Sequence, residues 1–288
     1  MSGVAGLAVT HHHVDLGDVS LHYVTAGAGF PVVLLHGWPQ TWYEWRHVIA
    51  RLAPRYRLIA PDMRGLGDSS RPAGGYDKAT VAGDLERLMR EVLGIPRFHL
   101  VGHDWGGPVA YALTVRAPQA VRSLTTVDVT MPGDGSDFSR GGQRWHHGLH
   151  REPEKLMERL TAGRERLYLS YLIRMLSHQV HAISEQDLDE YARCYSQPGA
   201  MSAGFEYYRA IPRDIAANEA SRARGRLRLP VLALGGGGRG GRGLEPGESM
   251  RAMAENVTGE AVPESGHFVP EEQPGLLAER LAGFFAQT

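Results

Sequence analysis

An aspartate flanked by glycines is the part of the sequence that most directly suggests chemistry. Asp104 lies in Gly102-His103-Asp104-Trp105-Gly106, between a strand-like run and a helix-like one. This is the nucleophile-elbow pattern, in which small residues on both sides of the nucleophile allow a tight turn from strand to helix. We therefore expect Asp104 to be a nucleophile.

A carboxylate nucleophile restricts the reaction more than a serine or a cysteine would. Attack on an ester would give an anhydride, whereas attack on an sp3 carbon that carries a leaving group gives an alkyl ester of the enzyme. Epoxides and alkyl halides both offer such a carbon. The sequence therefore favours these two substrate classes.

The loop after the strand-like run 31–35 supplies a second part of such a site. It contains His36–Pro39 (HGWP), and in nucleophile-elbow enzymes an amide of this loop and the amide after the nucleophile form the oxyanion hole. We assign the N–H groups of Trp38 and Trp105 to that hole. Pro39 is a candidate for a cis bond that bends the loop inward. An ordinary turn is the alternative interpretation.

A third segment, Asp62–Ser69 (DMRGLGDS), follows the strand-like run 57–60. We interpret it as architectural, holding the layer of loops above the sheet. Because Asp62 is an acid at a strand end, a functional role for it is the alternative.

Among fourteen histidines, His267 has the position of a general base, after the last strand-like run and before the last helix. Two acids are candidates to orient its imidazole. Asp128 follows the strand-like run 121–127, and Glu245 is the first acid after the run 230–234. We favour Asp128 and keep Glu245 as the alternative.

The elements that must position these residues alternate between strand-like and helix-like runs, which predicts an α/β fold with a mostly parallel sheet. The expected strands are 14–16, 20–25, 31–35, 57–60, 98–102, 121–127, 230–234 and 260–262. The expected core helices are 77–93, 107–115 and 276–285. Residues 131–220 hold no strand-like run, so we expect a helical cap inserted between core segments 1–130 and 221–288. The histidines His11–His13 are interpreted as a mobile N-terminal cluster, and the glycine-rich run 235–243 as a flexible loop.

The composition excludes several other classes of protein. The net charge is −1, so no global field attracts nucleic acid or an anionic membrane. The single cysteine, Cys194, excludes an intramolecular disulfide and a cysteine-based zinc site. No apolar run approaches the roughly 20 residues of a membrane span, and no signal peptide is recognised. We expect a soluble, cytoplasmic enzyme.

Together, the HGWP, DMRGLGDS and GHDWGG segments resemble those of the α/β-hydrolase-fold epoxide hydrolases and their dehalogenase relatives. The resemblance extends from His36 to His267. It implies the α/β-hydrolase fold, with an eight-stranded, mostly parallel sheet, flanking helices and an inserted helical cap. It also supports Asp128, because an acid after this strand is a known variant of the catalytic triad in that group.

The resemblance also implies two hydrogen-bond donors in the cap. Epoxide hydrolases bind the epoxide oxygen with two cap side chains, which are a histidine and a tyrosine in the bacterial Cif-type subgroup. The segment RWHH is similar to the first donor segment of that subgroup, with His146 as the donor and His147 as the alternative. The segment AGFEYYRA is similar to the second, with Tyr208 as the donor and Tyr207 as the alternative. A packing role is the alternative for both tyrosines.

The dehalogenase relatives fit the sequence less well. Haloacetate dehalogenases grip the substrate carboxylate with two arginines that follow the nucleophile, and here Trp105 and Pro108 occupy those positions. Haloalkane dehalogenases usually place an Asn or a Trp beside the nucleophile as a halide donor. Trp105 suits that role, but Trp38 stands where an Asn would follow His-Gly.

We therefore predict an epoxide hydrolase, which adds water to an epoxide through an alkyl ester on Asp104 and releases a vicinal diol. A haloalkane or haloacid dehalogenase is the alternative, and a non-catalytic ligand receptor is a third hypothesis. We expect a small-molecule epoxide as the partner, with no metal or organic cofactor, no nucleic acid and no membrane. The sequence does not fix the oligomeric state, and a homodimer is compatible with it.

Overall fold

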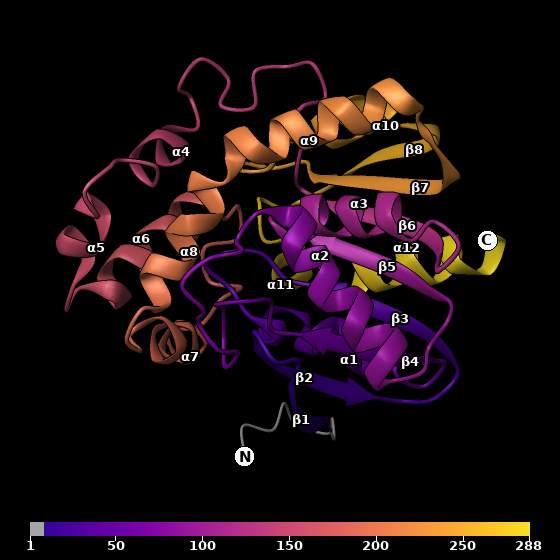
Figure 1. Cartoon of the computed structure of the whole chain (residues 1–288), viewed down its shortest axis with the longest axis horizontal. Helices are drawn as coiled ribbons and strands as arrows, with labels where there is room; N and C mark the ends of the chain where they lie inside the picture. Colours follow the sequence, from indigo (N-terminus) through magenta and orange to yellow (C-terminus); the bar gives the residue numbers. More distant parts are fainter. Residues whose placement is uncertain (1–8) are drawn as a thin grey trace.

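An eight-stranded sheet forms the centre of the chain in a computed structural model that describes residues 9–288. The strands lie in the order β1-β2-β4-β3-β5-β6-β7-β8 (Figure 1). Strand β2 runs antiparallel to both β1 and β4, and every other neighbouring pair is parallel. The expected eight-stranded, mostly parallel sheet is confirmed. The strand bounds are β1 Thr10–Asp15, β2 Ser20–Ala26, β3 Phe30–Leu35, β4 Tyr56–Pro61, β5 Phe98–His103, β6 Val121–Val127, β7 Leu227–Gly236 and β8 Ala254–Val262.

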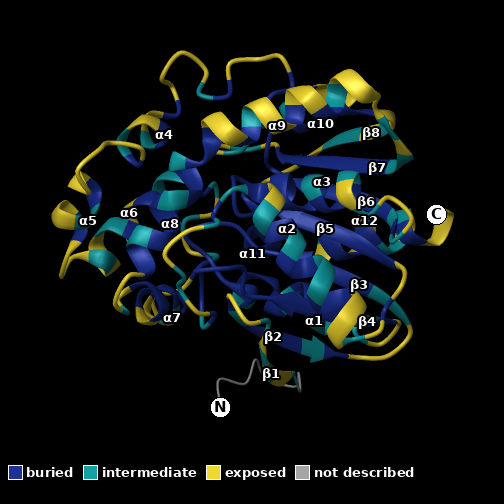
Figure 2. Cartoon of the chain, viewed as in Figure 1, coloured by how far each residue is buried: buried dark blue, intermediate teal, exposed yellow. Residues whose placement is uncertain are grey.

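Helices cover both faces of this sheet because alternate side chains of the central strands point to opposite faces and are apolar on both. On β3, for example, Val33 and Leu35 belong to one buried cluster, whereas Val32 and Leu34 belong to another. Figure 2 shows the central strands as the most continuously buried part of the fold. The first face is covered by α2 Lys78–Arg87, α3 Gly106–Arg116 and α10 Glu245–Met253. The second is covered by η1 Trp42–Trp45, α1 Arg46–Leu52, α11 Val269–Glu272 and α12 Pro274–Gln287.

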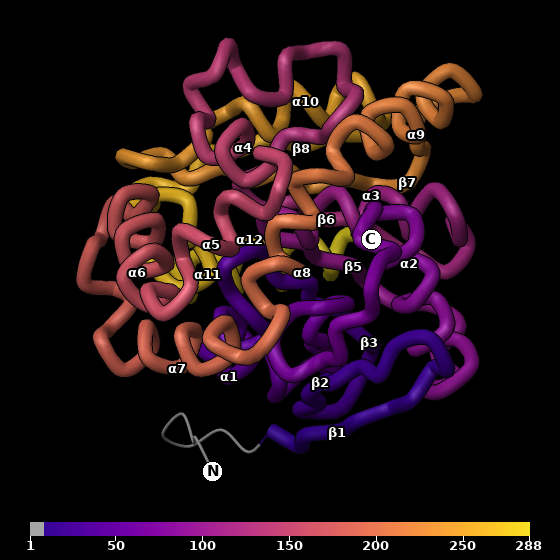
Figure 3. The backbone as a smooth tube through the Cα atoms, turned by 60° about the vertical axis from the view of Figure 1, so that its left-hand side comes forward, coloured from indigo at the N-terminus to yellow at the C-terminus, as the bar shows by residue number. Residues whose placement is uncertain are grey.

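The chain between β6 and β7 is helical, as the sequence predicts. Helices α4 to α8 lie to one side of the sheet (Figure 1), and α9 returns along the core towards β7 (Figure 3). Helix α9 ends at Arg224, slightly beyond the expected end of the cap at residue 220. The bounds of the six helices between β6 and β7 are α4 Trp145–Leu149, α5 Leu156–Thr161, α6 Glu165–Leu176, α7 Glu185–Tyr195, α8 Ala200–Arg209 and α9 Ile211–Arg224. Within residues 9–288, no helix combines the length and the apolar character needed to cross a membrane.

A buried polar network ties cap helix α7 to the core loop that carries the HGWP motif. The side-chain amide of Gln40 donates to the hydroxyl of Tyr191 over 3.0 Å and also to the carboxylate of Glu271. The hydroxyl of Tyr195 donates to the Gln40 carbonyl oxygen over 2.7 Å. Arg46 pairs with Glu271 in the same network. These contacts fix the cap above the motif.

The structure corrects some of the expected elements. Residues His11–His13 are not a mobile cluster but part of β1, in antiparallel register with β2. Their imidazoles take part in the strand contacts, since His11 Nδ1 lies 2.9 Å from His22 Nε2. Strands β7 and β8 are longer than expected, and the helix expected over 77–93 ends at Arg87 and continues as a π-helical turn, η2 Leu88–Val92.

A buried ion pair joins the core to the cap beneath the nucleophile loop. Lys78 Nζ lies 2.8 Å from Asp214 Oδ2, and each side chain is only 3% exposed. The same ammonium group donates to the Tyr207 carbonyl oxygen over 2.6 Å and lies 3.9 Å from the centre of the Trp105 ring. Lys78 therefore contacts α8, α9 and the residue that follows Asp104.

We expect Lys78→Met to lower the free energy of unfolding by about 3–5 kcal/mol, because it leaves the Asp214 carboxylate buried without its cation. The double variant Lys78→Met/Asp214→Leu should recover most of this loss, since neither buried charge remains. Urea denaturation followed by circular dichroism measures both changes. A double variant as unstable as Lys78→Met would contradict the assignment of a buried ion pair.

Candidate active site

The turn between β5 and α3 places Asp104 at the carboxyl end of the sheet. Its backbone φ is 45°, in the left-handed region that non-glycine residues rarely adopt. A Cβ atom on Gly102 would lie 2.2 Å from the Gly106 carbonyl oxygen, and one on Gly106 would lie 2.2 Å from the Leu35 carbonyl oxygen. Larger residues at these two positions would therefore force the elbow apart.

Backbone amides contact the Asp104 carboxylate. The Trp38 N–H donates to Asp104 Oδ1 over 3.0 Å, and the Trp105 N–H also donates to this carboxylate. The Trp38–Pro39 peptide bond is cis, as expected from the sequence. The predicted oxyanion-hole amides thus converge on the predicted nucleophile. The other oxygen, Oδ2, lies 3.6 Å from His267 Nε2.

The structure brings His267 together with Asp128 and not with Glu245. His267 Nδ1 lies 2.7 Å from Asp128 Oδ2. The second oxygen of Asp128 accepts the N–H groups of Gly236 and Arg242, each over 2.8 Å. Glu245 instead pairs with Arg140 and with Arg144, at 2.9 Å from Arg144 Nη2.

The charges around Asp104 favour its ionised form. Burial alone would raise the pKa of the Asp104 carboxyl, but His267, His103 and the two amides together lower it. The Asp104 side chain keeps 13% exposure, so a substrate can reach it. An ionised, accessible carboxylate is what a nucleophile requires.

His103 and Glu44 form a buried pair behind the nucleophile that was not predicted from the sequence. His103 Nδ1 lies 3.1 Å from Glu44 Oε2, and its Nε2 donates to the His267 carbonyl oxygen over 2.9 Å. Burial alone would lower the pKa of His103, but the Glu44 carboxylate raises it to about 9. At neutral pH His103 is therefore a cation that supports the charge on Asp104 and positions the backbone of His267. The only sequence signal for this pair was the place of His103 directly before the nucleophile.

The two cap donors favoured from the sequence both line the cavity above Asp104. This cavity has a volume of about 420 Å³ and includes Asp104, His267, His146 and Tyr208 among its lining residues. Volumes of roughly 300–1,000 Å³ are typical of small-molecule sites. Leu172, Met175 and Leu176 of α6 provide an apolar part of the wall.

The alternative donors point elsewhere. The hydroxyl of Tyr207 donates to the Arg64 carbonyl oxygen over 2.9 Å, and the ring of His147 stacks on Phe138 at 5.0 Å between centroids. Neither residue lines the cavity. Among these four cap side chains, only His146 and Tyr208 line the cavity.

Both cavity donors are neutral. Burial, followed by the nearby Arg242, lowers the pKa of His146 to about 4. Burial, followed by the charge of Asp104, raises the pKa of Tyr208 well above its usual range. A neutral imidazole and a neutral phenol can each donate one hydrogen bond to an oxygen on which negative charge develops.

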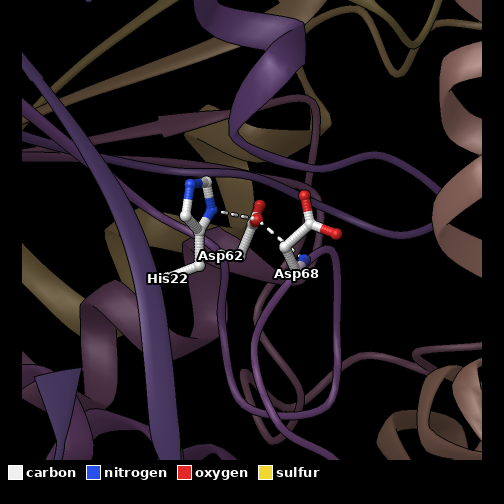
Figure 4. A group of neighbouring side chains, drawn as sticks. All are labelled: His22, Asp62 and Asp68. Carbon is white, nitrogen blue, oxygen red and sulfur yellow. Dashed lines mark hydrogen bonds and ion pairs between the residues drawn. The ribbon is translucent and has the colours of Figure 1, made fainter. Parts of the chain in front are cut away.

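Asp62 has an architectural place in the loop layer (Figure 4). Its carboxylate accepts the N–H groups of Trp42 over 2.8 Å and Asp68 over 3.0 Å, and it lies 2.7 Å from His22 Nδ1. His22, Asp62 and Asp68 are the only cluster with metal-binding spacing among residues 9–288. Because Asp62 is saturated by these contacts and Asp68 pairs with Arg193 at 2.8 Å, the cluster reads as structural rather than as a metal site.

Comparison with known proteins agrees with this architecture. Residues 31–274 match the model of the alpha/beta hydrolase fold family. The chain is 38% identical to a soluble epoxide hydrolase from Corynebacterium sp. (strain C12), over 96% of this chain and 98% of that protein.

The chain belongs to the alpha/beta hydrolase fold family.

Solved structures are similar to the chain over almost its full length. The hydrolase superimposes on the epoxide hydrolase CorEH with a TM-score of 0.88 and 36% identity, over 97% of this chain and 99% of that one. It superimposes on Cfl2 from Burkholderia cenocepacia with a TM-score of 0.89 and 38% identity, over 96% of each chain. A fluoroacetate dehalogenase from Burkholderia sp. is 32% identical over 68% of this chain and 67% of that protein. The expected fold, the hydrolase class and the resemblance to epoxide hydrolases are confirmed.

The alternative triad acids give a direct test of the site. We expect Asp128→Asn to slow the hydrolysis of the enzyme ester by on the order of a hundredfold or more, because a misoriented imidazole is a poor base. Glu245→Gln should have a much smaller effect, since Glu245 contacts two arginines and not His267. Single-turnover kinetics measures the step in both variants. The opposite ranking would move the acid to Glu245.

Proposed function

We propose that this hydrolase opens epoxides with water to give vicinal diols, through an alkyl ester on Asp104. The main support is the arrangement of charged and neutral groups in the cavity. The cavity has an ionised carboxylate on the core side and two neutral hydrogen-bond donors, His146 and Tyr208, on the cap side. A group that is attacked at carbon while its oxygen becomes negative fits between them.

The first step is ring opening. Asp104 Oδ2 attacks an epoxide carbon, which forms a carbon–oxygen bond and breaks the bond from that carbon to the ring oxygen. The released alkoxide accepts hydrogen bonds from His146 and Tyr208 and takes up one proton to become a hydroxyl group. The Trp38 amide holds Oδ1, and the Trp105 amide also contacts the carboxylate. The Trp38 contact leaves Oδ2 free to attack the substrate. The product of this step is an ester between Asp104 and the substrate.

The second step is hydrolysis of that ester. His267 Nε2 faces the Asp104 carboxyl and takes a proton from water, which attacks the carboxyl carbon. Asp128 holds the other nitrogen of the imidazole and stabilises the imidazolium that forms. The Trp38 and Trp105 amides then bind the oxyanion of the tetrahedral intermediate. Collapse of the intermediate expels the substrate oxygen, which takes the proton back from His267 as the diol leaves. The Asp104 carboxyl then loses a proton, which replaces the one taken up in ring opening, so the steps use neither a metal nor an organic cofactor.

Dehalogenation by the same aspartate is the competing reaction. The similarity to a fluoroacetate dehalogenase supports dehalogenation as an alternative. However, Trp105 and Pro108 are not basic and cannot bind a substrate carboxylate beside the nucleophile. A halide is also a stable anion that needs weaker solvation than an alkoxide does. A paired His and Tyr therefore suit an epoxide better. The cytoplasmic location and the homodimer stay predictions.

Tyr208→Phe should separate the two reactions. Loss of one donor to the developing alkoxide should slow alkylation of Asp104 by roughly ten- to a thousandfold, while ester hydrolysis should be almost unchanged. Tyr207→Phe is the matched control, because the Tyr207 hydroxyl contacts the Arg64 backbone outside the cavity. Pre-steady-state kinetics with styrene oxides and aliphatic epoxides, with identification of the diol, measures both steps.

Two results together would show that the protein is a dehalogenase and not an epoxide hydrolase. These are an unchanged alkylation rate in Tyr208→Phe, and faster halide release from haloacids than opening of any epoxide by the wild-type protein.

A further inference from the structure

One cation of the active-site cavity has no role in the two steps above. Arg242 lies in the glycine-rich loop after β7 and lines the same cavity as Asp104, His146 and His267. Its backbone N–H and its side-chain Nε both bind Asp128, the Nε over 2.8 Å to the Asp128 carbonyl oxygen. The side chain is therefore fixed at its Nε, and its two terminal nitrogens extend beyond that contact.

Those two terminal nitrogens are free to bind a ligand. Within the described residues 9–288, neither Nη1 nor Nη2 of Arg242 has a hydrogen-bond partner. Because neither nitrogen is among the fully buried polar atoms that lack a partner, both are accessible to solvent or to a ligand. Asp128 Oδ2 is 3.8 Å from the Arg242 Nε, but this carboxylate oxygen is already 2.7 Å from His267 Nδ1. The guanidinium end is thus a rigidly held pair of donors in the wall of the cavity.

The other arginines of the cavity are already paired. Arg140 and Arg144 share the carboxylate of Glu245, and Arg144 Nη1 also donates to Thr130 Oγ1 over 3.0 Å and to the Phe138 carbonyl oxygen. The charged lining residues are therefore three arginines against Asp104 and Glu245. Once Asp104 is esterified, its charge is lost and the excess of positive charge increases.

The neighbouring groups respond to this positive field. Burial is the largest cause, and the charge of Arg242 the second largest, of the lowered pKa values of His146, about 4, and Arg144, about 10. A site that disfavours further cations favours an anion. A planar guanidinium group with two parallel N–H donors matches the geometry of a carboxylate.

We propose that the preferred substrates of this enzyme are epoxides that carry a carboxylate, which Arg242 binds while Asp104 attacks the ring. This inference rests on the proposed epoxide hydrolase function and names its substrate class. Arg242 binds the part of the substrate that does not react, and the cap donors bind the part that does. The carboxylate is bound in the ground state and in the transition state, so the effect falls on kcat/KM.

The test uses a series of terminal epoxyalkanoates of four to seven carbons, each with its uncharged amide. The series covers a range of distances between the ring and the carboxylate. We expect the best acid to exceed its amide in kcat/KM by about tenfold or more, as for a hydrogen bond between charged groups. Arg242→Gln should lower this acid-to-amide ratio by about tenfold or more, and Arg242→Lys should lower it less.

The ratio separates substrate binding from a structural role of Arg242. Because Arg242 also contacts Asp128, its loss can slow both substrates, and a purely structural effect cancels in the ratio. Arg280→Gln is the matched control, since it removes the same charge from the exposed surface of α12. Its acid-to-amide ratio should equal that of the wild-type protein.

The outcomes distinguish this inference from the proposed function. Turnover of the amides and of styrene oxide, with no preference for any acid or with an unchanged ratio in Arg242→Gln, would overturn the inference and leave the epoxide hydrolase function in place. A lack of turnover of every epoxide, or faster halide release from 2-haloacids, would overturn the function itself.

Discussion

The active site depends on one strained turn. Asp104 adopts a left-handed backbone conformation between β5 and α3, and Gly102 and Gly106 make the close backbone approaches that this turn requires. The turn lifts the carboxylate out of the end of the sheet and towards the amides of Trp38 and Trp105. The neighbouring parallel strands then bring their own ends to the same edge, so that Asp128 after β6 can hold the imidazole of His267.

Burial has opposite consequences on the two sides of the cavity, and the proposed reaction needs both. On the core side, the His103 cation, the imidazole of His267 and two amides overcome burial and keep Asp104 ionised. On the cap side, burial keeps the imidazole of His146 and the phenol of Tyr208 neutral. A charged nucleophile thus faces uncharged donors, which is the arrangement that a neutral ring with a basic leaving oxygen requires.

Local patterns predicted the central strands and the nucleophile loop, because β3, β5 and β6 are short apolar runs whose ends carry the motifs. Contacts between distant segments were harder to predict. The pairing of His267 with Asp128 spans 139 residues, so the sequence left Glu245 as an alternative. The sequence favoured His146 but left His147 as an alternative, because adjacent residues of a helix face different directions and only the packing of α4 decides which one meets the cavity. His11–His13 were misread because a short polar strand is defined by its pairing with β2 and not by its own pattern.

In the proposed reaction Asp104, and not a water molecule, attacks the substrate. A single turnover in 18O-labelled water, with enzyme in excess over an epoxide, distinguishes the two routes. If Asp104 attacks, the diol of the first turnover carries unlabelled oxygen from Asp104, and mass spectrometry finds one 18O atom in the peptide that contains Asp104. A labelled diol from the first turnover, with an unlabelled peptide, would mean direct attack by water and would rule out the alkyl ester on Asp104.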